Sequence, residues 1–357
     1  MQESAFITLK TRMPSIRSLE TMSPAYKVSK SEIPEVANVW LANDELSKEK
    51  YKRISSNSGV ENRYYIQPWQ ETLKLGGLEA RTSIFEEMGE PLLRSAVNKA
   101  LETSSIDPAD IGYLLFTSCS VPVIPSIDAK VILNTNLPRT INRLPIFQHG
   151  CVGGVVGLSM GSRLAQLGKP VIVTSLELCS LVFQGNNTAG SQLVGASIFA
   201  DGAAAMIIDP GQGEINFVDS MSYLIPDSRH LMGYDIHDDG FHLRLDRNLP
   251  SVLTKEAPQL VNAFLAKHEL TTKDVDYWLF HPGGKKILDY FEETFELEKE
   301  RCCWARDVLR DNGNMSSATI LFVMKRFMET SKLEKGQKAL VVGIGPGLTI
   351  ELVLFEG

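Results

Sequence analysis

The stretch His149-Gly-Cys-Val-Gly-Gly-Val-Val-Gly-Leu-Ser-Met-Gly-Ser-Arg-Leu164 places a cysteine between a short apolar run and a segment rich in small residues. The preceding run, Leu144–Phe147, predicts a buried strand, and the glycines that flank the cysteine permit a tight turn into a helix. At a helix N-terminus, free N–H groups and the helix dipole favour thiolate over thiol. The stretch therefore predicts that Cys151 is a nucleophile, with a buried structural cysteine as the alternative.

The same pattern returns in the second part of the chain. Asp110-Ile-Gly-Tyr-Leu-Leu-Phe116 recurs as Asp274-Val-Asp-Tyr-Trp-Leu-Phe280, a shift of 164 (274 − 110). Lys169-Pro-Val-Ile-Val173 likewise matches Lys338-Ala-Leu-Val-Val342. Two copies of a unit in which strands and helices alternate predict an α/β fold of two similar halves related by a pseudo-twofold axis. We place the halves at residues 1–212 and 213–357.

The repeat also predicts where polar residues meet. Gly313-Asn314 aligns with Gly150-Cys151 at a shift of 163 (313 − 150), and His281 directly follows the second copy of a strand. Parallel α/β sheets carry their sites beyond the carboxyl ends of the strands, so we expect Cys151, His281 and Asn314 to converge. A thiolate can hold an acyl group, while a histidine and an amide can stabilise a developing oxyanion. Taken singly, His281 is also typical of a strand-ending turn and Asn314 of a helix cap.

Charge and cysteine usage exclude several classes of function. The formal net charge is −7, which argues against nucleic acid or an acidic membrane surface as the main partner. The five cysteines include no Cys-x-x-Cys pair and no spacing typical of a metal site, so we expect free thiols and no metal. Cys302 and Cys303 lie in a charged segment that suggests the surface. The sequence shows no signal peptide and no membrane span, which predicts a cytoplasmic protein.

Three segments carry a resemblance to a known family. His281-Pro-Gly-Gly284, Gly313-Asn-Met-Ser-Ser-Ala-Thr-Ile-Leu-Phe322 and Gly343-Ile-Gly-Pro-Gly-Leu-Thr-Ile-Glu351 resemble the signatures of type III polyketide synthases, the chalcone synthase-like family. The resemblance implies a thiolase-type αβαβα layered fold, a homodimer and no permanently bound cofactor. It also implies that an acyl-CoA starter is extended with malonyl-CoA by decarboxylative Claisen condensation. The chain would then be cyclised to a resorcinol, phloroglucinol, pyrone or naphthalene-type product.

The resemblance assigns roles to individual residues. Cys151 resembles the acyl-carrying nucleophile of the family, and His281 with Asn314 resembles its decarboxylation and oxyanion pair. Lys50 and Arg53 match basic residues that hold the phosphates of coenzyme A.

Other matched positions line the substrate cavity. Phe199 and Phe241 match two phenylalanines that stand between the coenzyme A tunnel and the cavity. Ile124 precedes Pro125, matching a cis proline in a dimer-interface loop whose preceding residue reaches into the cavity of the partner. The cavity positions implied by the resemblance are Cys119, Ile124, Cys179, Phe199, Phe241, Ile344 and Pro346.

Four departures separate this chain from the plant pattern. Ile344 replaces a phenylalanine and His149 a glutamine, while Asn57 stands where a third basic residue would contact coenzyme A. Cys119 replaces a threonine and resembles bacterial members, including tetrahydroxynaphthalene and phloroglucinol-type synthases. Smaller side chains at cavity positions would lengthen the cavity, so an alkyl starter is compatible with the sequence. No role for His149 follows from the sequence.

Two other functions share parts of this pattern. A condensing enzyme of the ketoacyl-carrier-protein synthase III type uses a similar Cys-His-Asn set on the same fold, although the C-terminal motifs here resemble the type III family. A non-catalytic acyl-binding partner subunit is the second alternative, and the intact set of three residues argues against it.

Overall fold

The structure, a computed structural model, describes residues 13–357 and is built on one large sheet. Its nine strands, in sheet order, run β11-β12-β13-β8-β1-β7-β6-β4-β5, with the bounds β1 Ser15–Met22, β4 Tyr113–Ser118, β5 Asn142–Phe147, β6 Val171–Leu178, β7 Asp201–Asp209, β8 Ile215–Leu224, β11 Tyr277–Phe280, β12 Lys338–Gly345 and β13 Thr349–Glu356. Two small antiparallel pairs accompany it: β2 Tyr26–Ser29 with β3 Asn62–Tyr65, and β9 Met232–His237 with β10 Gly240–Leu245.

Eleven α-helices are found in the described part of the chain. They are α1 Ile33–Trp40, α2 Glu45–Ser56, α3 Trp69–Thr72, α4 Leu78–Ser104, α5 Asp128–Leu133, α6 Gly153–Ala165, α7 Gly190–Ile198, α8 Leu249–Ala266, α9 Lys285–Thr294, α10 Cys303–Asn312 and α11 Thr319–Thr330. Between residues 13 and 357, no helix combines the length and the apolarity needed to cross a membrane.

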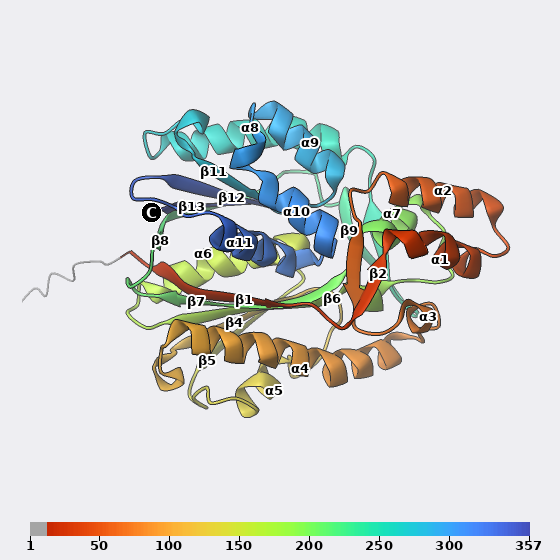
Figure 1. Ribbon diagram of the computed structural model, residues 1–357, viewed down its shortest axis with the longest axis horizontal. Coiled ribbons are helices and arrows are strands. Elements are labelled where there is room, and N and C mark those ends of the chain that lie inside the picture. The colour runs from red at the N-terminus through yellow and green to blue at the C-terminus, as the bar shows by residue number, and fades with distance from the viewer. Residues whose placement is uncertain (1–12) are drawn as a thin grey trace, which may run out of the picture.

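The elements form five layers (Figure 1). Helices α6 and α11 lie between the two halves of the sheet, α4 covers one outer face, and α8 and α9 cover the other. In the first half, β4 pairs with β6 in parallel while β6–β7 and β7–β1 are antiparallel. The second half repeats this arrangement with β11, β12, β13 and β8. The predicted αβαβα fold of two similar halves is therefore confirmed.

The sequence explains why the centre is so tightly packed. Strands β6 and β12 are buried almost throughout and read as nearly continuous apolar runs, as expected for strands covered on both faces. Helix α6 carries glycines on the faces that meet its neighbours. A Cβ at Gly154 would overlap the backbone carbonyl of Ser317, and one at Gly161 would lie 2.6 Å from Cγ2 of Val173. The small residues of α6 thus allow both the second half and β6 to approach its backbone.

The structure corrects the register of the repeat. One-turn 3₁₀ helices begin at Gly150 and Ser316, a shift of 166 (316 − 150), so Ser317 rather than Asn314 stands in the place of Cys151. The strands paired with β4 and β11 are also displaced by one residue from the predicted match. Short matches of small and apolar letters tolerate such slips because neighbouring positions carry similar residues. The equivalent loops are nevertheless those that the repeat indicated.

The interpretation of Leu144–Phe147 as a buried strand is wrong. These residues belong to β5, which pairs only with β4 and forms one edge of the large sheet. The first four residues of β5 are exposed, and Leu144 keeps 37% of its surface accessible. An apolar run indicates that a strand will be buried. It does not indicate whether the burying surface belongs to the same chain.

A buried carboxyl on β13 makes the stability of the fold depend on pH. Glu351 is 4% exposed, and burial raises its pKa from 4.5 to about 7 against the opposing effects of Ser222 and Arg163. The folded state therefore binds more protons than the unfolded state between these values. The stabilisation is complete below pH 4.5 and is lost as the pH rises through 7, by at most about 3 kcal/mol.

We expect Glu351→Gln to remove this part of the pH dependence. Urea denaturation at pH 5 and pH 8 should show a smaller loss of unfolding free energy in the variant than in the unmodified protein. Glu356→Gln, a half-exposed position on the same strand, serves as the control and should leave the difference unchanged. An equal pH dependence in all three proteins would contradict the assignment.

Candidate active site

Cys151 lies in the 3₁₀ turn Gly150–Val152, immediately before α6. Gly150 has φ +60°, and a Cβ there would lie 2.5 Å from Cδ of Pro346. Glycine thus lets the loop after β12 pack directly beside the cysteine. The thiol is half-buried, and its Sγ accepts a hydrogen bond from Ser316 Oγ at 3.6 Å.

Ser316 joins several of the predicted site residues. Besides its contact with Cys151, its Oγ lies 3.2 Å from Sγ of Cys119, and its backbone N–H donates to Oδ1 of Asn314 at 2.9 Å. Its φ of +47° turns the chain between Asn314 and the start of the next helix. The sequence alone assigned no role to Ser316, although it stands within the Gly313–Phe322 motif. The structure makes Ser316 a link between the two halves of the site.

Asn314 is 1% exposed and is held through both its backbone and its side chain. Its N–H donates to the carbonyl of Ile198 at 2.7 Å, and its carbonyl accepts from the N–H of Ala200 at 2.9 Å, so it lies beside Phe199. Its Oδ1 also accepts from Thr319 Oγ1 at 3.2 Å. With the oxygen engaged at the helix start, the Nδ2 group points the other way. The Asn314 amide is thus oriented as a hydrogen-bond donor.

His281 follows β11 and is 2% exposed. Its backbone N–H donates to the carbonyl of Val342 at 2.9 Å, which fixes it at the carboxyl end of the strand pair. Both ring nitrogens are buried, and neither finds a hydrogen-bond partner among residues 13–357. Burial lowers its pKa to about 4, so the ring is neutral at pH 7. An unpaired buried polar group costs about 1–3 kcal/mol, which a bound substrate that pairs with the ring would recover.

The protonation state of the free thiol differs from the prediction made from the helix terminus. Burial raises the pKa of Cys151 to about 11, and the hydrogen bond from Ser316 offsets only part of this effect. The nearby buried carboxyl of Glu177 raises it further. The expectation that the helix dipole favours the thiolate is therefore wrong for the free enzyme, because desolvation outweighs it. Cys151 and His281 are both neutral at rest, so the thiol must lose its proton as it attacks.

Alkylation tests this protonation state. The iodoacetamide reaction at Cys151 should accelerate about 100-fold between pH 7 and pH 9, because the thiolate fraction rises tenfold per pH unit below the pKa. Cys151 should still react first, since Cys119, Cys179 and Cys302 are buried. Burial of Cys302 also corrects the surface location suggested by its charged neighbours.

Peptide mapping after timed alkylation gives the rate at each cysteine. Cys303, the other half-buried cysteine, is the internal comparison. A rate at Cys151 that is flat between pH 7 and pH 9 would restore the low-pKa interpretation. A faster rate at Cys303 would contradict the expected order.

A small pocket lies beside this cluster, next to Phe199, whose backbone pairs with Asn314. Cys179 and Phe199, both predicted for the cavity, line it. Phe241 stacks on Tyr234, a further lining residue, with ring centroids 5.7 Å apart. The remaining lining residues are Tyr65, Ser180, Val182, Phe183, Gln192, Gly195, Ala196 and Leu243.

The other predicted cavity positions are distributed around the cluster. Cys119 contacts Ser316, Pro346 packs against Gly150, and Ile344 is buried within β12. Ile124 is different, since it is 100% exposed. The Ile124–Pro125 peptide bond is cis.

The predicted coenzyme A contacts lie on α2. Lys50 and Arg53 are exposed, and neither takes part in the ion pairs found among residues 13–357. In contrast, two other lysines of the same helix are ion-paired. Lys48 pairs with Glu45 at 2.8 Å, and Lys52 pairs with Glu49 at 3.0 Å. Asn57, the departure from the family pattern, donates to the carbonyl of Arg53 at 2.8 Å and closes the helix end.

His149 and Gln148 are exposed on the approach to the cysteine. Gln148 has φ +76°. The backbone oxygen of His149 packs close to Gly345, since a Cβ added there would lie 2.9 Å from this oxygen. The side chain of His149 makes none of the hydrogen bonds found in the described chain, and its position indicates no catalytic role.

Comparison with known proteins agrees with this architecture. Residues 13–212 match the family model described as the N-terminal domain of chalcone and stilbene synthases, and residues 216–357 match the C-terminal domain. A phloroglucinol synthase of Pseudomonas fluorescens is 30% identical over 85% of this chain and 88% of its own. A 1,3,6,8-tetrahydroxynaphthalene synthase of Streptomyces coelicolor is 29% identical over 85% of this chain and 81% of its own.

A solved structure extends the likeness to three dimensions. The crystal structure of 1,3,6,8-tetrahydroxynaphthalene synthase from Streptomyces coelicolor, a bacterial type III polyketide synthase, superimposes with a TM-score of 0.91 at 26% identity. The match covers 96% of this chain and 98% of that one. Both family domains, in order and over nearly the whole described chain, establish that this protein belongs to the chalcone and stilbene synthase family and is a type III polyketide synthase.

Proposed function

We propose that Cys151 carries the growing acyl chain while His281 and Asn314 stabilise the oxyanions of the reaction. The observation that carries this proposal is the contact through Ser316, which joins the Cys151 thiol to the Asn314 amide across the two halves of the fold. The unpartnered ring of His281 supports it, because a buried imidazole with two open nitrogens is suited to a ligand. Such groups bind a developing oxyanion more strongly in a buried site than in water.

The loading step requires a proton acceptor. The Cys151 sulfur attacks the thioester carbonyl of an acyl-CoA starter, and its proton passes to the neutral ring of His281. The tetrahedral oxyanion collapses, coenzyme A leaves as a thiol with that proton, and the acyl group remains on sulfur as a thioester. His281 then returns to its neutral form for the next step.

The extension step begins with malonyl-CoA. Loss of carbon dioxide leaves the electron pair of the broken C–C bond in an enolate, whose oxygen accepts hydrogen bonds from His281 and Asn314. The enolate carbon attacks the acyl thioester on Cys151, a new C–C bond forms, and the thiolate leaves. The extended chain is then a thioester of coenzyme A, and the Cys151 thiolate attacks its carbonyl, so that coenzyme A leaves and the chain returns to the sulfur. Repetition followed by ring closure yields a resorcinol, phloroglucinol, pyrone or naphthalene-type product. Relatives named for phloroglucinol and tetrahydroxynaphthalene synthesis support aromatic products.

We further propose that coenzyme A docks against α2. Lys50 and Arg53 offer two exposed cations free of ion pairs in the described chain, which suits phosphate groups. Asn57 reduces the positive charge relative to the family pattern.

A homodimer completes the proposed assembly. The exposed outer edge of β5 can pair with the same strand of a second copy around a twofold axis. Arg143 on β5 donates to Asp128 at 2.7 and 3.0 Å and to Ser126 at 3.2 Å, which fastens the Ile124 loop to this edge. Ile124, fully exposed, would then enter the cavity of the partner.

A charge at this position should oppose assembly. We expect Ile124→Glu to raise the dimer dissociation constant at least about tenfold, because burying an unpaired carboxylate is costly. Sedimentation velocity over a dilution series measures the change. Leu46→Glu, at a 68% exposed position on α2, is the control and should sediment as the unmodified protein does. Equal sedimentation of both variants would place the interface elsewhere.

Product analysis tests the catalytic proposal. Purified enzyme is incubated with carbon-13-labelled malonyl-CoA and a panel of aromatic and alkyl acyl-CoA starters, and the products are analysed by mass spectrometry. We expect products that contain one starter and several labelled two-carbon units. Release of a single-extension product only, or a requirement for malonyl groups on a carrier protein, would contradict the proposal and favour a ketoacyl synthase activity.

A further inference from the structure

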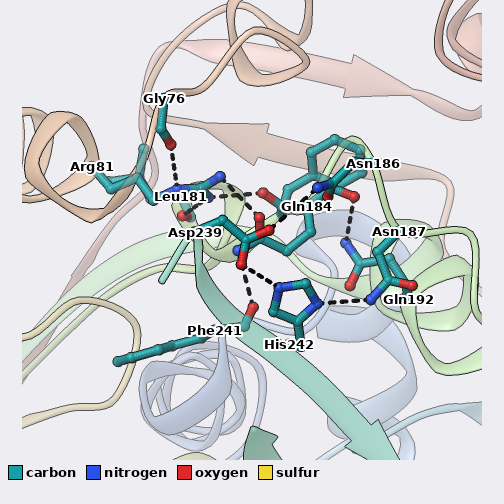
Figure 2. Close-up of polar contacts among 11 residues, drawn as sticks. Gly76, Arg81, Leu181, Gln184, Asn186, Asn187, Gln192, Asp239, Phe241 and His242 are labelled. Atoms are coloured by element: carbon teal, nitrogen blue, oxygen red, sulfur yellow. Dashed lines mark hydrogen bonds and ion pairs between the residues drawn. The ribbon is translucent and has the colours of Figure 1, made fainter. Parts of the chain in front are cut away.

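A buried polar network fastens the β9–β10 hairpin to the loop before α7 (Figure 2). Gln184, at its centre, is 2% exposed. Its Nε2 donates to the backbone carbonyl of Phe241 at 3.2 Å, and its Oε1 accepts from Nη2 of Arg81 at 3.3 Å. A single side-chain amide thus joins a buried arginine to one of the two phenylalanines predicted to border the cavity.

Arg81 holds this amide in one orientation. Its guanidinium donates to the carbonyls of Gly76 at 2.9 Å and Phe183 at 2.8 Å, and also to the carbonyl of Leu181. These bonds fix an arginine that is 4% exposed. Because a guanidinium only donates, Oε1 of Gln184 must face it, and Nε2 must face the Phe241 carbonyl. Of the side chains of this length, only glutamine supplies an acceptor and a donor together.

The turn before Phe241 depends on this contact. Gly240 has φ +131°, and a Cβ there would lie 2.7 Å from Nε2 of Gln184, so the chain passes the amide without a side chain between them. On the outer side of the turn, Asp239 accepts from His242 at 2.8 Å, and Asn187 contacts the other ring nitrogen of His242 at 2.9 Å. The backbone that carries the phenylalanine is therefore held from both sides.

Gln184 is also connected to the second phenylalanine. Nε2 of Gln192, in the first turn of α7, donates to the backbone carbonyl of Gln184 at 3.4 Å. Helix α7 ends at Ile198, directly before Phe199. The segments that carry Phe199 and Phe241 are thus both anchored to residue 184.

We propose that Gln184, oriented by Arg81, is a positioning residue that sets the placement of Phe241 relative to Phe199. It thereby controls which acyl chains the enzyme accepts and how far it extends them. The inference rests on the proposed function, since it needs these two rings to border the substrate path. No contact of Gln184 with the reacting atoms is required.

Gln184→Glu tests the inference by replacing only the donor. The carboxylate still accepts from Arg81, but it presents an oxygen to the Phe241 carbonyl and repels it. We expect KM for the acyl-CoA starter to rise about tenfold and the distribution of product lengths to shift. Decarboxylation of malonyl-CoA, which does not need the starter, should change by less than about twofold.

Two controls separate positioning from general damage. Gln166→Glu makes the same change at an exposed position and should leave KM and products unchanged. Gln184→Asn keeps both polar groups but withdraws them by one methylene, and it should shift the products in the same sense. This variant replaces Gln184→Glu as the test if the glutamate variant fails to fold. Thermal melting identifies variants that fold.

A double-mutant cycle with Phe241→Ala decides the outcome. If Gln184 acts through this ring, Gln184→Glu should alter KM and product lengths much less in the Phe241→Ala background. Unchanged products in both Gln184 variants, or an equal effect with and without the ring, would overturn the inference. Absence of any polyketide from the unmodified enzyme would instead refute the proposed function.

Discussion

We expect Cys151→Ala to form no detectable polyketide while it still releases carbon dioxide from malonyl-CoA. The substitution removes the sulfur that we propose holds the acyl chain, whereas His281 and Asn314 remain in place to receive the enolate oxygen. Loading and condensation are therefore lost together, and decarboxylation is separated from them. Mass spectrometry of products and of the intact protein, with labelled carbon dioxide release in parallel, measures all three activities.

The matched control for this variant is Cys303→Ala. Cys303 is the other half-buried cysteine, and it lies at the start of α10, away from the residues that contact Ser316. The Cys303→Ala variant should retain full activity and acquire the acyl adduct on Cys151. A polyketide formed at an undiminished rate by Cys151→Ala would show that the chain grows without a covalent link to this sulfur.

The second large effect is expected for Asn314→Asp. The aspartate keeps the oxygen that accepts from Ser316 and Thr319, so the local backbone is preserved. It replaces the donor Nδ2 by a second, negatively charged oxygen. Loss of one such donor reduces turnover by about 100- to 1,000-fold, and the added charge opposes the enolate further. Decarboxylation and condensation should both fall by at least this factor.

Asn312→Asp, two residues earlier, makes the same chemical change. Its side chain donates to Ser23 at 3.3 Å rather than to any residue of the proposed site. Activity within about twofold of the unmodified enzyme is expected. If Asn314→Asp decarboxylates malonyl-CoA as fast as this control does, the oxyanion must be stabilised by other groups.

The repeat and the family resemblance predicted the layered fold, which the structure confirms, and short local motifs indicated the residues that we propose for the site. A strand followed by His281-Pro-Gly-Gly, or Gly313-Asn314 before a helix, specifies its own turn. The convergence of the two loops followed from the repeat, even though the register of that repeat was wrong by three residues.

What the sequence missed depends on contacts between distant residues. Gln184 and Phe241 are 57 positions apart, and nothing in either neighbourhood marks the bond between them. The state of the Cys151 thiol was missed for a related reason. The helix start is visible in the sequence, but the desolvation that raises its pKa comes from residues packed around it in three dimensions.

The bare outer edge of β5 carries a hazard during biosynthesis. A newly folded protomer offers unpaired backbone groups to any extended chain nearby, which is how off-pathway aggregates begin. Pro145 removes one N–H group from the strand, and Arg143, ion-paired with Asp128, holds the Ile124 loop beside it. Both features discourage indiscriminate strand addition. In the proposed dimer, the edge would accept only a partner whose register tolerates a missing donor, and the soluble yield would then depend on how quickly that partner is met.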